Sequence, residues 1–297
     1  MTQDPDSAQG GRAVLAERKH WEGVNFIDTC TVIDADSPTR PSRLERLLGT
    51  EMAGVLGTRP AELAFWQRIV PKWINKRDPT VLELGSAPGG NLVEFRNRFN
   101  ATVTGIEYSD SGAELNRRKF EQERIPKTSV IHADMFDPKL DGEFAARFDV
   151  VFSRGLVEHF RKPSVAISRH ADFVAPGGVI IITIPNLHGV TGWSVRATAP
   201  ELIPLHNLEI MSTRALAACA SEAMLDVQFC GYFGMMDVAF CPPQDSSGVR
   251  HFLYRMMKLA QLPINVIGAI GFEQLLNSSV TSPQIALVCT KQQRATR

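Results

Sequence analysis

The stretch VLELGSAPGGN, residues 81–91, leads an apolar run through a glycine-rich turn into a helical pattern. Glycines in such a turn let a ligand approach the backbone, and amides at a helix N-terminus can face its polar groups. A phosphate-binding loop would need Lys and a hydroxyl residue directly after Gly90, where the chain has Asn-Leu, and a dinucleotide fingerprint would need glycine at Ala87. The chain therefore matches neither fingerprint, although an oxidoreductase that binds a dinucleotide remains a rival hypothesis. Glu83, two residues before Gly85, favours a different ligand.

Acid–base chemistry could come from three histidines, because imidazole titrates near neutral pH. His159 follows the fourth strand-like run, which favours a place beside a reacting group or a structural role bonded to backbone. His206 lies in a later loop and is a candidate base or a surface or capping residue, and His188 is a further candidate base or substrate contact. Arg154 could bind an anionic substrate or pair with Glu158.

Short apolar runs alternate with helical patterns from residue 80 onward. The runs are near-continuously apolar and β-branched, which is typical of a parallel sheet buried on both faces. The predicted strands are Thr80–Leu84, Val103–Glu107, Ser129–His132, Val150–Ser153, Val179–Ile184, Leu225–Tyr232 and Gln284–Thr290. The predicted helices between and after them are Leu92–Phe99, Gly112–Glu123, Pro163–Phe173 and Thr213–Met224. This alternation predicts a doubly wound α/β sheet.

The composition excludes several classes of protein. Lys plus Arg and Asp plus Glu each number 32 among 297 residues, and the net charge of zero argues against a nucleic-acid binder. Hydrophobic residues make up 44%, enough for a sizeable core, yet no run approaches the roughly 20 apolar residues that span a bilayer. The N-terminus is polar, without a secretory pattern, and the five scattered cysteines are typical of reduced thiols. We therefore expect a cytoplasmic protein with no nucleic-acid partner and no stable membrane insertion.

The acidic residue and glycine-rich turn of ELGSAPGG resemble the first motif of the class I S-adenosylmethionine-dependent methyltransferases. The strand ends VTGIEYS, HADMF and FDVVFSRGLVEH, and the turn VAPGG, resemble later motifs of that family, in the family's order. The resemblance is close over residues 80–186. It implies a Rossmann-like, mostly parallel sheet of seven strands with the last strand antiparallel, and S-adenosylmethionine as the cofactor.

The resemblance also implies particular cofactor contacts. Glu107 would accept hydrogen bonds from both ribose hydroxyls, because two carboxylate oxygens match two vicinal hydroxyls. Tyr108 would lie beside the adenine, Asp134 would take the adenine amino group, and Met135 would pack on the ring. The remaining cofactor-binding candidates are Glu83, Gly85, Ser86, Gly89 and Ser153. The alternative for each is an ordinary structural role, as a turn glycine, a strand-end acid or a solvated loop residue.

The chain divides into three parts in this interpretation. Residues 1–11 are expected to form a disordered tail and residues 12–78 an N-terminal helical cap. Residues 79–297 would form the methyltransferase domain, with cap insertions at about 186–211 and 235–283. The cap and its insertions are expected to form a lid over an apolar acceptor pocket.

Two helical segments of the cap carry specific predictions. Thr58 is a candidate N-cap for an amphipathic helix that ends near Asn75. In the second insertion, Phe252, Met256 and Leu259 lie among basic residues. This pattern favours packing onto the core, and contact with a membrane surface and a lipid-linked substrate is the alternative.

The end of the fourth strand discriminates between kinds of methyl transfer. Ser153 and Arg154 stand where amino-group methyltransferases often show Asn-Pro-Pro-Tyr and where metal-dependent catechol-type enzymes carry an Asp ligand, so we expect no metal. RNA 2′-O-methyltransferases need a Lys-Asp-Lys-Glu constellation that this region does not match, and the neutral charge is a second objection.

The segment after the fourth strand resembles small-molecule enzymes of the ubiquinone-biosynthesis O-methyltransferase type, because Glu158-His159 has their pattern. We therefore expect transfer to a hydroxyl of a small molecule, such as a sugar or another biosynthetic intermediate, with His206 or His159 as base. N- or C-methylation of a small molecule and, less favoured, RNA 2′-O-methylation remain as alternatives. The sequence leaves the oligomeric state open.

Overall fold

The computed structural model describes residues 14–16, 18–22, 56–243, 248–271 and 275–291. Its strands are β1 (Thr80–Leu84), β2 (Thr102–Glu107), β3 (Val130–His132), β4 (Phe148–Arg154), β5 (Val174–Pro185), β6 (Leu225–Phe233) and β7 (Gln284–Lys291). Its α-helices are α1 (Arg18–Glu22), α4 (Pro60–Ala64), α5 (Gly90–Phe99), α6 (Asp110–Gln122), α7 (Lys139–Phe144), α8 (Pro163–Phe173), α9 (Gly189–Thr198), α10 (Thr213–Glu222) and α11 (Val249–Ala269).

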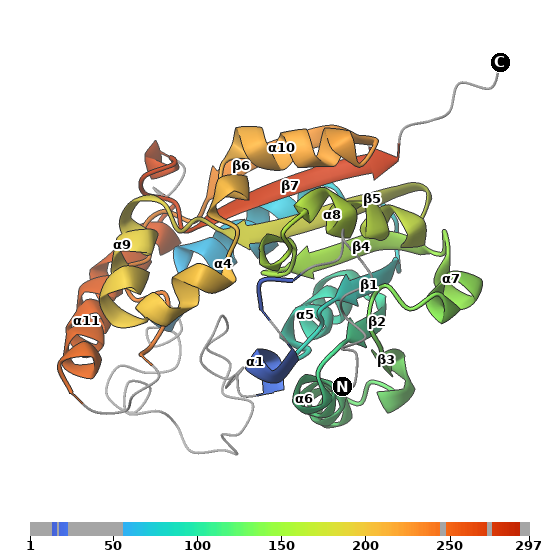
Figure 1. The fold of residues 1–297 in the computed structure, drawn as a ribbon, viewed down its shortest axis with the longest axis horizontal. Coiled ribbons are helices and arrows are strands. Elements are labelled where there is room, and N and C mark those ends of the chain that lie inside the picture. The colour runs from blue at the N-terminus through green and yellow to red at the C-terminus, as the bar shows by residue number, and fades with distance from the viewer. Residues whose placement is uncertain (1–13, 17, 23–55, 244–247, 272–274, 292–297) are drawn as a thin grey trace, which may run out of the picture.

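The strands form one seven-stranded sheet in the order β3-β2-β1-β4-β5-β7-β6 (Figure 1). Every neighbouring pair from β3 to β5 is parallel, and β7 is antiparallel to both β5 and β6. The strand order reverses between β1 and β4, which is the switch point of a doubly wound sheet and the place where such sheets bind ligands. The predicted fold class, with its antiparallel last strand, is confirmed.

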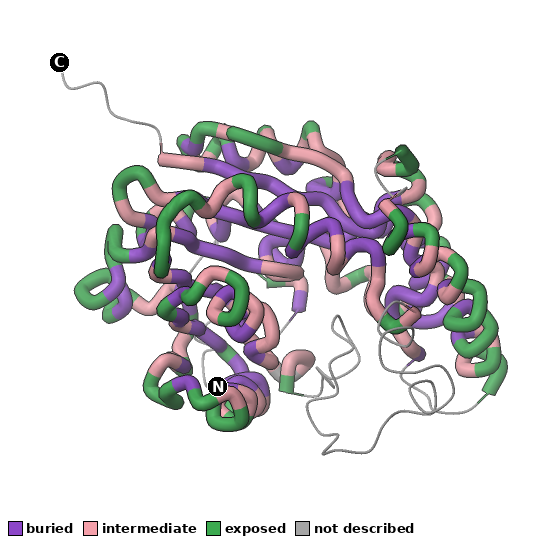
Figure 2. The backbone as a smooth tube through the Cα atoms, turned by 180° about the vertical axis from the view of Figure 1, so that it is seen from behind, coloured by how far each residue is buried: buried purple, intermediate pink, exposed green. Residues whose placement is uncertain are grey.

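Helices cover both faces of the sheet, and each face has its own hydrophobic core. On one face α7, α8 and α10 contribute Leu140, Ile167 and Leu216. On the other, α5 and α6 contribute Phe95 and Phe120. Figure 2 shows the central strands buried for most of their length, with the exposed residues on the helices and connecting segments around them. This burial on two faces is the physical reason for the near-continuous apolar runs in the sequence.

The segment that follows Thr58 does not form the single helix expected there. The N-cap of α4 is Arg59, whose side chain makes no capping hydrogen bond, so the assignment of Thr58 was wrong. The helix gives way to a π-helical turn over Phe65–Ile69 and a 3₁₀ turn over Val70–Lys72. Pro71 has no N–H to donate, so an α-helix cannot continue through it with its hydrogen bonds intact.

This π-helical turn packs on the sheet rather than capping it. The ring centroid of Phe65 lies 5.6 Å from that of Phe152 in β4, and Trp66 lies 5.0 Å from Phe95 in α5. The division expected at residue 79 stays a prediction, although part of the segment before it packs on the sheet. The tail expected at residues 1–11 lies outside the described residues.

Helix α11 packs against α4 and α9 at the carboxyl end of the parallel strands (Figure 1), and these three helices are called the cap below; that they form a lid over an acceptor pocket stays a prediction. The side chains of Phe252, Met256 and Leu259 point away from this packing, with 66%, 48% and 59% of their surface exposed. The expectation that these three pack onto the core was therefore wrong. Among the described helices there is no segment long and apolar enough to cross a bilayer.

Candidate functional site

The glycine-rich turn joins β1 to α5 at the switch point of the sheet. Gly85 and Gly89 adopt positive φ angles of 70° and 95°, which residues with a Cβ rarely adopt. The amides of Gly85 and Ser86 donate to the carbonyl of Ile106 in β2, at 2.9 and 3.2 Å. A Cβ on Gly89 would come within 2.3 Å of Oδ1 of Asn116. The turn is thus held close to β2 and offers bare backbone, as the motif predicted.

Glu83 lies just before this turn and is buried, with 1% of its surface exposed. Nδ2 of Asn91 donates to its Oε1 at 2.7 Å, whereas its Oε2 has no hydrogen-bond partner in the described part of the chain. Burial raises the pKa of Glu83 to about 8, against the lowering effect of the Asn91 hydrogen bond. An orphaned buried carboxylate oxygen of this kind suits a cationic ligand group.

Glu107 ends β2 and is oriented by three protein donors. Its Oε2 accepts from the amide of Ala87 at 3.1 Å, and its Oε1 accepts from the amide and hydroxyl of Ser109, both at 2.9 Å. Each carboxylate oxygen can accept more than one hydrogen bond, so capacity for a diol remains. Ser86 is fixed in turn by Asn116, whose Nδ2 donates to its Oγ at 2.6 Å.

The adenine candidates follow β2 and β3. Tyr108 is 40% exposed, and the guanidinium of Arg18 lies 5.1 Å from its ring centroid. Asp134 is exposed, and its Oδ1 accepts from the amide of Phe136 at 2.9 Å. Met135 belongs to the hydrophobic core with 7% of its surface exposed. Tyr108 and Asp134 are thus accessible to a ligand. Met135 has little exposed surface with which to contact a ligand.

Ser153 points into the protein. Its Oγ lies 2.8 Å from Nε2 of His170 in α8, and Nδ1 of that histidine lies 2.8 Å from the carbonyl of Ala166. A carbonyl only accepts, so Nδ1 carries the proton and Nε2 accepts from the serine hydroxyl. Burial lowers the pKa of His170 to about 4, in keeping with a neutral ring. Because the hydroxyl of Ser153 is engaged by His170, a contact between Ser153 and the cofactor would have to be made by the backbone of Ser153.

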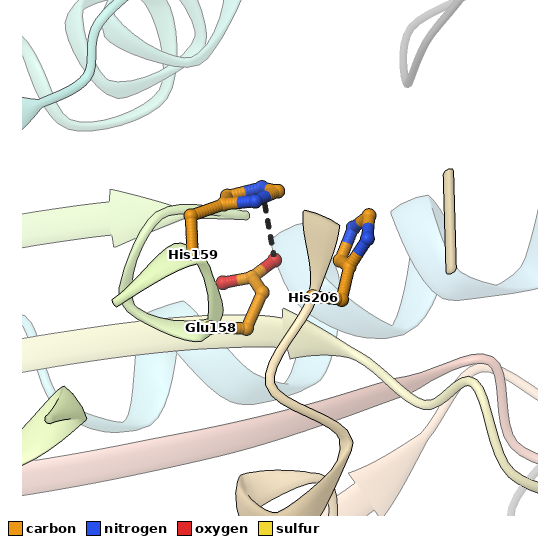
Figure 3. Close-up of side chains that lie close together, drawn as sticks. All are labelled: Glu158, His159 and His206. Atoms are coloured by element: carbon orange, nitrogen blue, oxygen red, sulfur yellow. Dashed lines mark ion pairs between the residues drawn. The ribbon is translucent and has the colours of Figure 1, made fainter. Parts of the chain in front are cut away.

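Two of the candidate histidines meet at the end of β4. His159 closes a 3₁₀ turn after that strand, and His206 follows another after α9, yet their ring centroids are 4.5 Å apart. Glu158 lies beside them, and Figure 3 shows its carboxylate turned toward His159, with Oε1 and Nε2 separated by 4.0 Å. Neither oxygen of Glu158 has a hydrogen-bond partner among the described residues, although the side chain is fully buried.

The protonation states of this cluster follow from burial and from backbone contacts. Nδ1 of His159 lies 2.8 Å from the carbonyl of Leu205, and Nδ1 of His206 lies 2.7 Å from that of Leu202, so both Nδ1 atoms carry a proton. Burial, with the neighbouring imidazole, lowers the pKa of His159 to about 3, and burial also lowers that of His206.

Burial raises the pKa of Glu158 to about 8. At pH 7 the contact between Glu158 and His159 is therefore a contact between neutral groups, and each imidazole presents an unprotonated Nε2. Ligand atoms of Glu158, His159 and His206 lie within 4.8 Å of one another, a set that could also hold a metal ion. The expectation of no metal thus stays a prediction.

The two substrate candidates have structural partners. Both terminal nitrogens of Arg154 donate to the carboxylate of Glu62 in α4, one of them at 3.1 Å, and its guanidinium lies 5.5 Å from the ring of Phe65. His188 is exposed, and its Nε2 lies 3.1 Å from the carbonyl of Leu208, outside the histidine cluster. A substrate contact at either residue stays a prediction.

Sequence reasoning missed several residues that shape the site. Asn91 stands in the glycine-rich stretch but was weighed there only in place of a phosphate-loop lysine, Asn116 lies in α6 with no motif around it, and Glu62 is distant in sequence from Arg154. Glu158 carried a usable signal, because an acid next to a histidine directly after a strand often sits at a site. Its burial without a partner could only come from the tertiary structure.

The sheet order, the glycine-rich turn and the acidic strand ends define a Rossmann-like class I methyltransferase domain. A family model described as "Methyltransferase domain" matches residues 58–227, more than half of the chain. The chain belongs to this family of S-adenosylmethionine-dependent methyltransferases. The match begins at residue 58, in agreement with the packing of the segment after α4 on the sheet.

Curated relatives match the central part of the chain. Ubiquinone biosynthesis O-methyltransferase of Shewanella pealeana is 32% identical over 111 residues, which cover 36% of this chain and 43% of that protein. The enzyme of the same name from Coxiella burnetii is 27% identical over 119 residues, covering 40% and 49%. The chain thus spans a little under half the length of these relatives.

Solved structures share the fold. Geranyl diphosphate C-methyltransferase from Streptomyces coelicolor A3(2) has a TM-score of 0.54 at 13% identity, covering 92% of this chain and 96% of that one. Phosphoethanolamine N-methyltransferase 2 of Haemonchus contortus has a TM-score of 0.51 at 17% identity, covering 84% and 59%. At these identities the likeness shows the architecture alone.

Proposed function

We propose that the chain transfers the methyl group of S-adenosylmethionine to a hydroxyl of a small molecule, with the proton accepted at the histidine cluster. The observation that carries this proposal is the unprotonated Nε2 of two imidazoles, the buried His159 and the half-buried His206, at the carboxyl end of β4. A hydroxyl acceptor needs such a base, since it must lose a proton as its oxygen attacks the methyl group.

The cofactor would be held by the turn and the strand ends. Glu83 suits the ammonium of the methionine half, because its Oε2 is buried without a described partner. Glu107 suits the ribose hydroxyls, and the accessible Tyr108 and Asp134 suit the adenine. The bare backbone of Gly85, with the remaining turn candidates Ser86 and Gly89, allows close approach. When bound, S-adenosylmethionine supplies a methyl group on a sulfonium, an electrophile that needs no further activation.

The histidines have distinct roles in this proposal. His206 would accept the hydroxyl proton at Nε2 as the acceptor oxygen attacks, and S-adenosylmethionine, when bound, would supply the methyl group with its sulfur as the leaving group. His159 and Glu158 position the imidazole of His206. The ring centroids of His159 and His206 are 4.5 Å apart. The Nδ1 donor to Leu202 fixes the tautomer that leaves Nε2 able to accept.

The likeness to enzymes named ubiquinone biosynthesis O-methyltransferase supports oxygen as the methylated atom. Methylation of nitrogen or carbon is the second candidate, because the structural neighbours include a geranyl diphosphate C-methyltransferase. The neutral net charge continues to argue against RNA. The scattered cysteines, typical of reduced thiols, support a place in the cytoplasm.

The test is a screen of hydroxylated, amino and carbon-acid metabolites for uptake of radiolabelled methyl from S-adenosylmethionine. NMR of the product then identifies the methylated atom. Label on oxygen, lost in a His206→Ala variant that still binds the cofactor, is the expected result. Label on nitrogen or carbon would overturn the hydroxyl assignment and leave the family unchanged.

A further inference from the structure

Helix α11 (Val249–Ala269) is inserted between β6 and β7, and one side of it packs on the cap. The side chains on that side recur every three or four residues and include two buried amides. Nε2 of Gln261 donates to the carbonyl of Met236 and to Oδ1 of Asn265, each at 3.0 Å. The buried positions are Tyr254, Met257, Gln261, Asn265 and Gly268. This side fixes how the helix is rotated about its axis.

The opposite side of α11 is apolar and exposed. Its residues also recur at intervals of three or four, so they form one stripe along the helix rather than scattered positions. The stripe consists of Val249, Phe252, Met256, Leu259, Pro263, Ile267 and, just past the helix, Ile270. Its ends are strongly exposed, at 83% for Val249 and 65% for Ile270. An amphipathic helix normally turns its apolar side inward, and this one has apolar residues on its outer side as well.

The charges on α11 are all of one sign. No acidic residue occurs between Gly248 and Ile270, whereas Arg250, Arg255 and Lys258 are basic and exposed. Arg250 pairs with Glu201, with its Nη1 3.5 Å from Oε2 of that carboxylate. Arg255 and Lys258 form no ion pair with a carboxylate of the described residues. At about 100° per residue, Arg255 borders the apolar stripe, whereas Lys258 lies farther round the helix, with its Nζ 5.9 Å from the ring centroid of Tyr254.

We propose that the exposed side of α11 docks on the surface of an anionic phospholipid bilayer. A helix of this kind lies in the plane of the interface, with its apolar stripe at the acyl boundary and its basic residues among the headgroups. A second copy of the chain would fit less well, because pairing of this side would bring the basic residues of two helices together with no carboxylate on α11 to offset them. Charge complementarity thus selects the lipid surface.

Docking through α11 has a consequence for the acceptor. Helix α11 packs on α9, which follows the carboxyl end of β5, so the docked side lies at the same end of the sheet as His159 and His206 (Figure 1). The membrane would then adjoin the end at which the acceptor is expected, and a membrane-soluble acceptor could enter without crossing water. This consequence rests on the proposed function, whereas docking itself does not.

The test is sedimentation of the full chain with vesicles of phosphatidylcholine alone and with about one third phosphatidylglycerol. We expect binding to the anionic vesicles that weakens at about 0.5 M salt, because screening reduces the attraction. Two double variants should each lower the bound fraction about tenfold or more: Phe252→Ser with Leu259→Ser, and Arg255→Glu with Lys258→Glu. Met224→Asn, which removes an equally exposed side chain in the turn just before β6, should bind to the vesicles as the unmodified protein does.

Each variant must also bind S-adenosylmethionine with unchanged affinity, which shows that the fold is intact. Equal sedimentation with both kinds of vesicle, or with neither, would overturn the proposal. So would a dimer in sedimentation velocity that the Phe252→Ser, Leu259→Ser variant dissociates, because a second copy would then cover the stripe. None of these outcomes depends on which acceptor is methylated, so failure here is distinct from failure of the proposed function.

Discussion

Glu83 offers a sharp test of the cofactor site, because its burial without a partner for Oε2 links protonation to both stability and binding. Its pKa rises from an ordinary 4.5 to about 8 on folding. The folded state therefore favours the protonated acid, and the stability this gives is complete below pH 4.5 and lost as the pH rises through 8. A difference of about 3.5 units corresponds to about 5 kcal/mol.

Replacing Glu83 by Gln removes this titration while keeping an oxygen for Asn91. The new amide N–H₂ lacks a partner, which costs about 1–3 kcal/mol at every pH. Urea unfolding without cofactor should thus show the original protein losing about 4 kcal/mol more than the variant between pH 5 and pH 9. Glu114→Gln, which removes an exposed carboxylate in α6, is the matched control and should keep the original pH dependence.

Folding favours the protonated form of Glu83, whereas cofactor binding should favour the ionised form. A cation placed against Glu83 favours the ionised acid, so binding at pH 7 should release about 0.9 proton, the fraction protonated beforehand. Calorimetry in buffers of different ionisation enthalpy measures this release, and Glu83→Gln should abolish it while weakening affinity. Identical pH dependence in both proteins would refute the burial argument, and binding without proton release would refute the ammonium contact.

Other substitutions test the remaining parts of the site. Glu107→Ala should weaken cofactor binding by about 1–3 kcal/mol in calorimetry, through lost charged hydrogen bonds, and an unchanged dissociation constant would remove Glu107 from the site. His206→Ala should slow turnover by about 10²-fold or more at saturating cofactor, and a near-normal rate would pass the role of base to His159 or to water. Dialysis of the protein against a chelator should leave the rate of methyl transfer unchanged, since the imidazole of His206 needs no metal to accept a proton. A loss restored by added Mn²⁺ would instead assign the cluster to a cation. Gly105→Ala should lower the unfolding free energy by about 1–3 kcal/mol, because its Cβ would lie 2.4 Å from Oγ of Ser86, and an unmoved urea midpoint would contradict that packing.

The fold was largely predictable because burial on two faces imprints itself on the sequence. The predicted Thr80–Leu84 and Pro163–Phe173 agree with β1 and α8 to the residue. The turn expected at Pro176 instead lies inside β5, which begins at Val174 and pairs through an irregular register with β4. Glycine and proline indicate a turn locally, whereas the neighbouring strand decides whether pairing continues around it.

The positions of site residues could be predicted from the sequence only where a local motif follows a strand directly. The turn around Gly85 and the acid at Glu107 follow strands directly, so their positions in the fold follow from the topology. The meeting of His159 and His206 does not, because α8, β5 and α9 separate them in the chain. Glu62 illustrates the same limit, since its pairing with Arg154 depends on how α4 packs rather than on any spacing.

The insertion that carries α11 leaves β6 at Phe233 and returns to β7 at Gln284, and these two residues are direct partners in the antiparallel ladder. Its two ends are therefore a single strand spacing apart, which makes the whole insertion an elaborated hairpin loop. Such a loop can grow, shrink or be exchanged without shifting any strand by a residue. Grafting it onto a relative with a plain turn at this corner would transfer the outer surface of α11 to another catalyst, and trimming it here to a short turn would leave the sheet order intact.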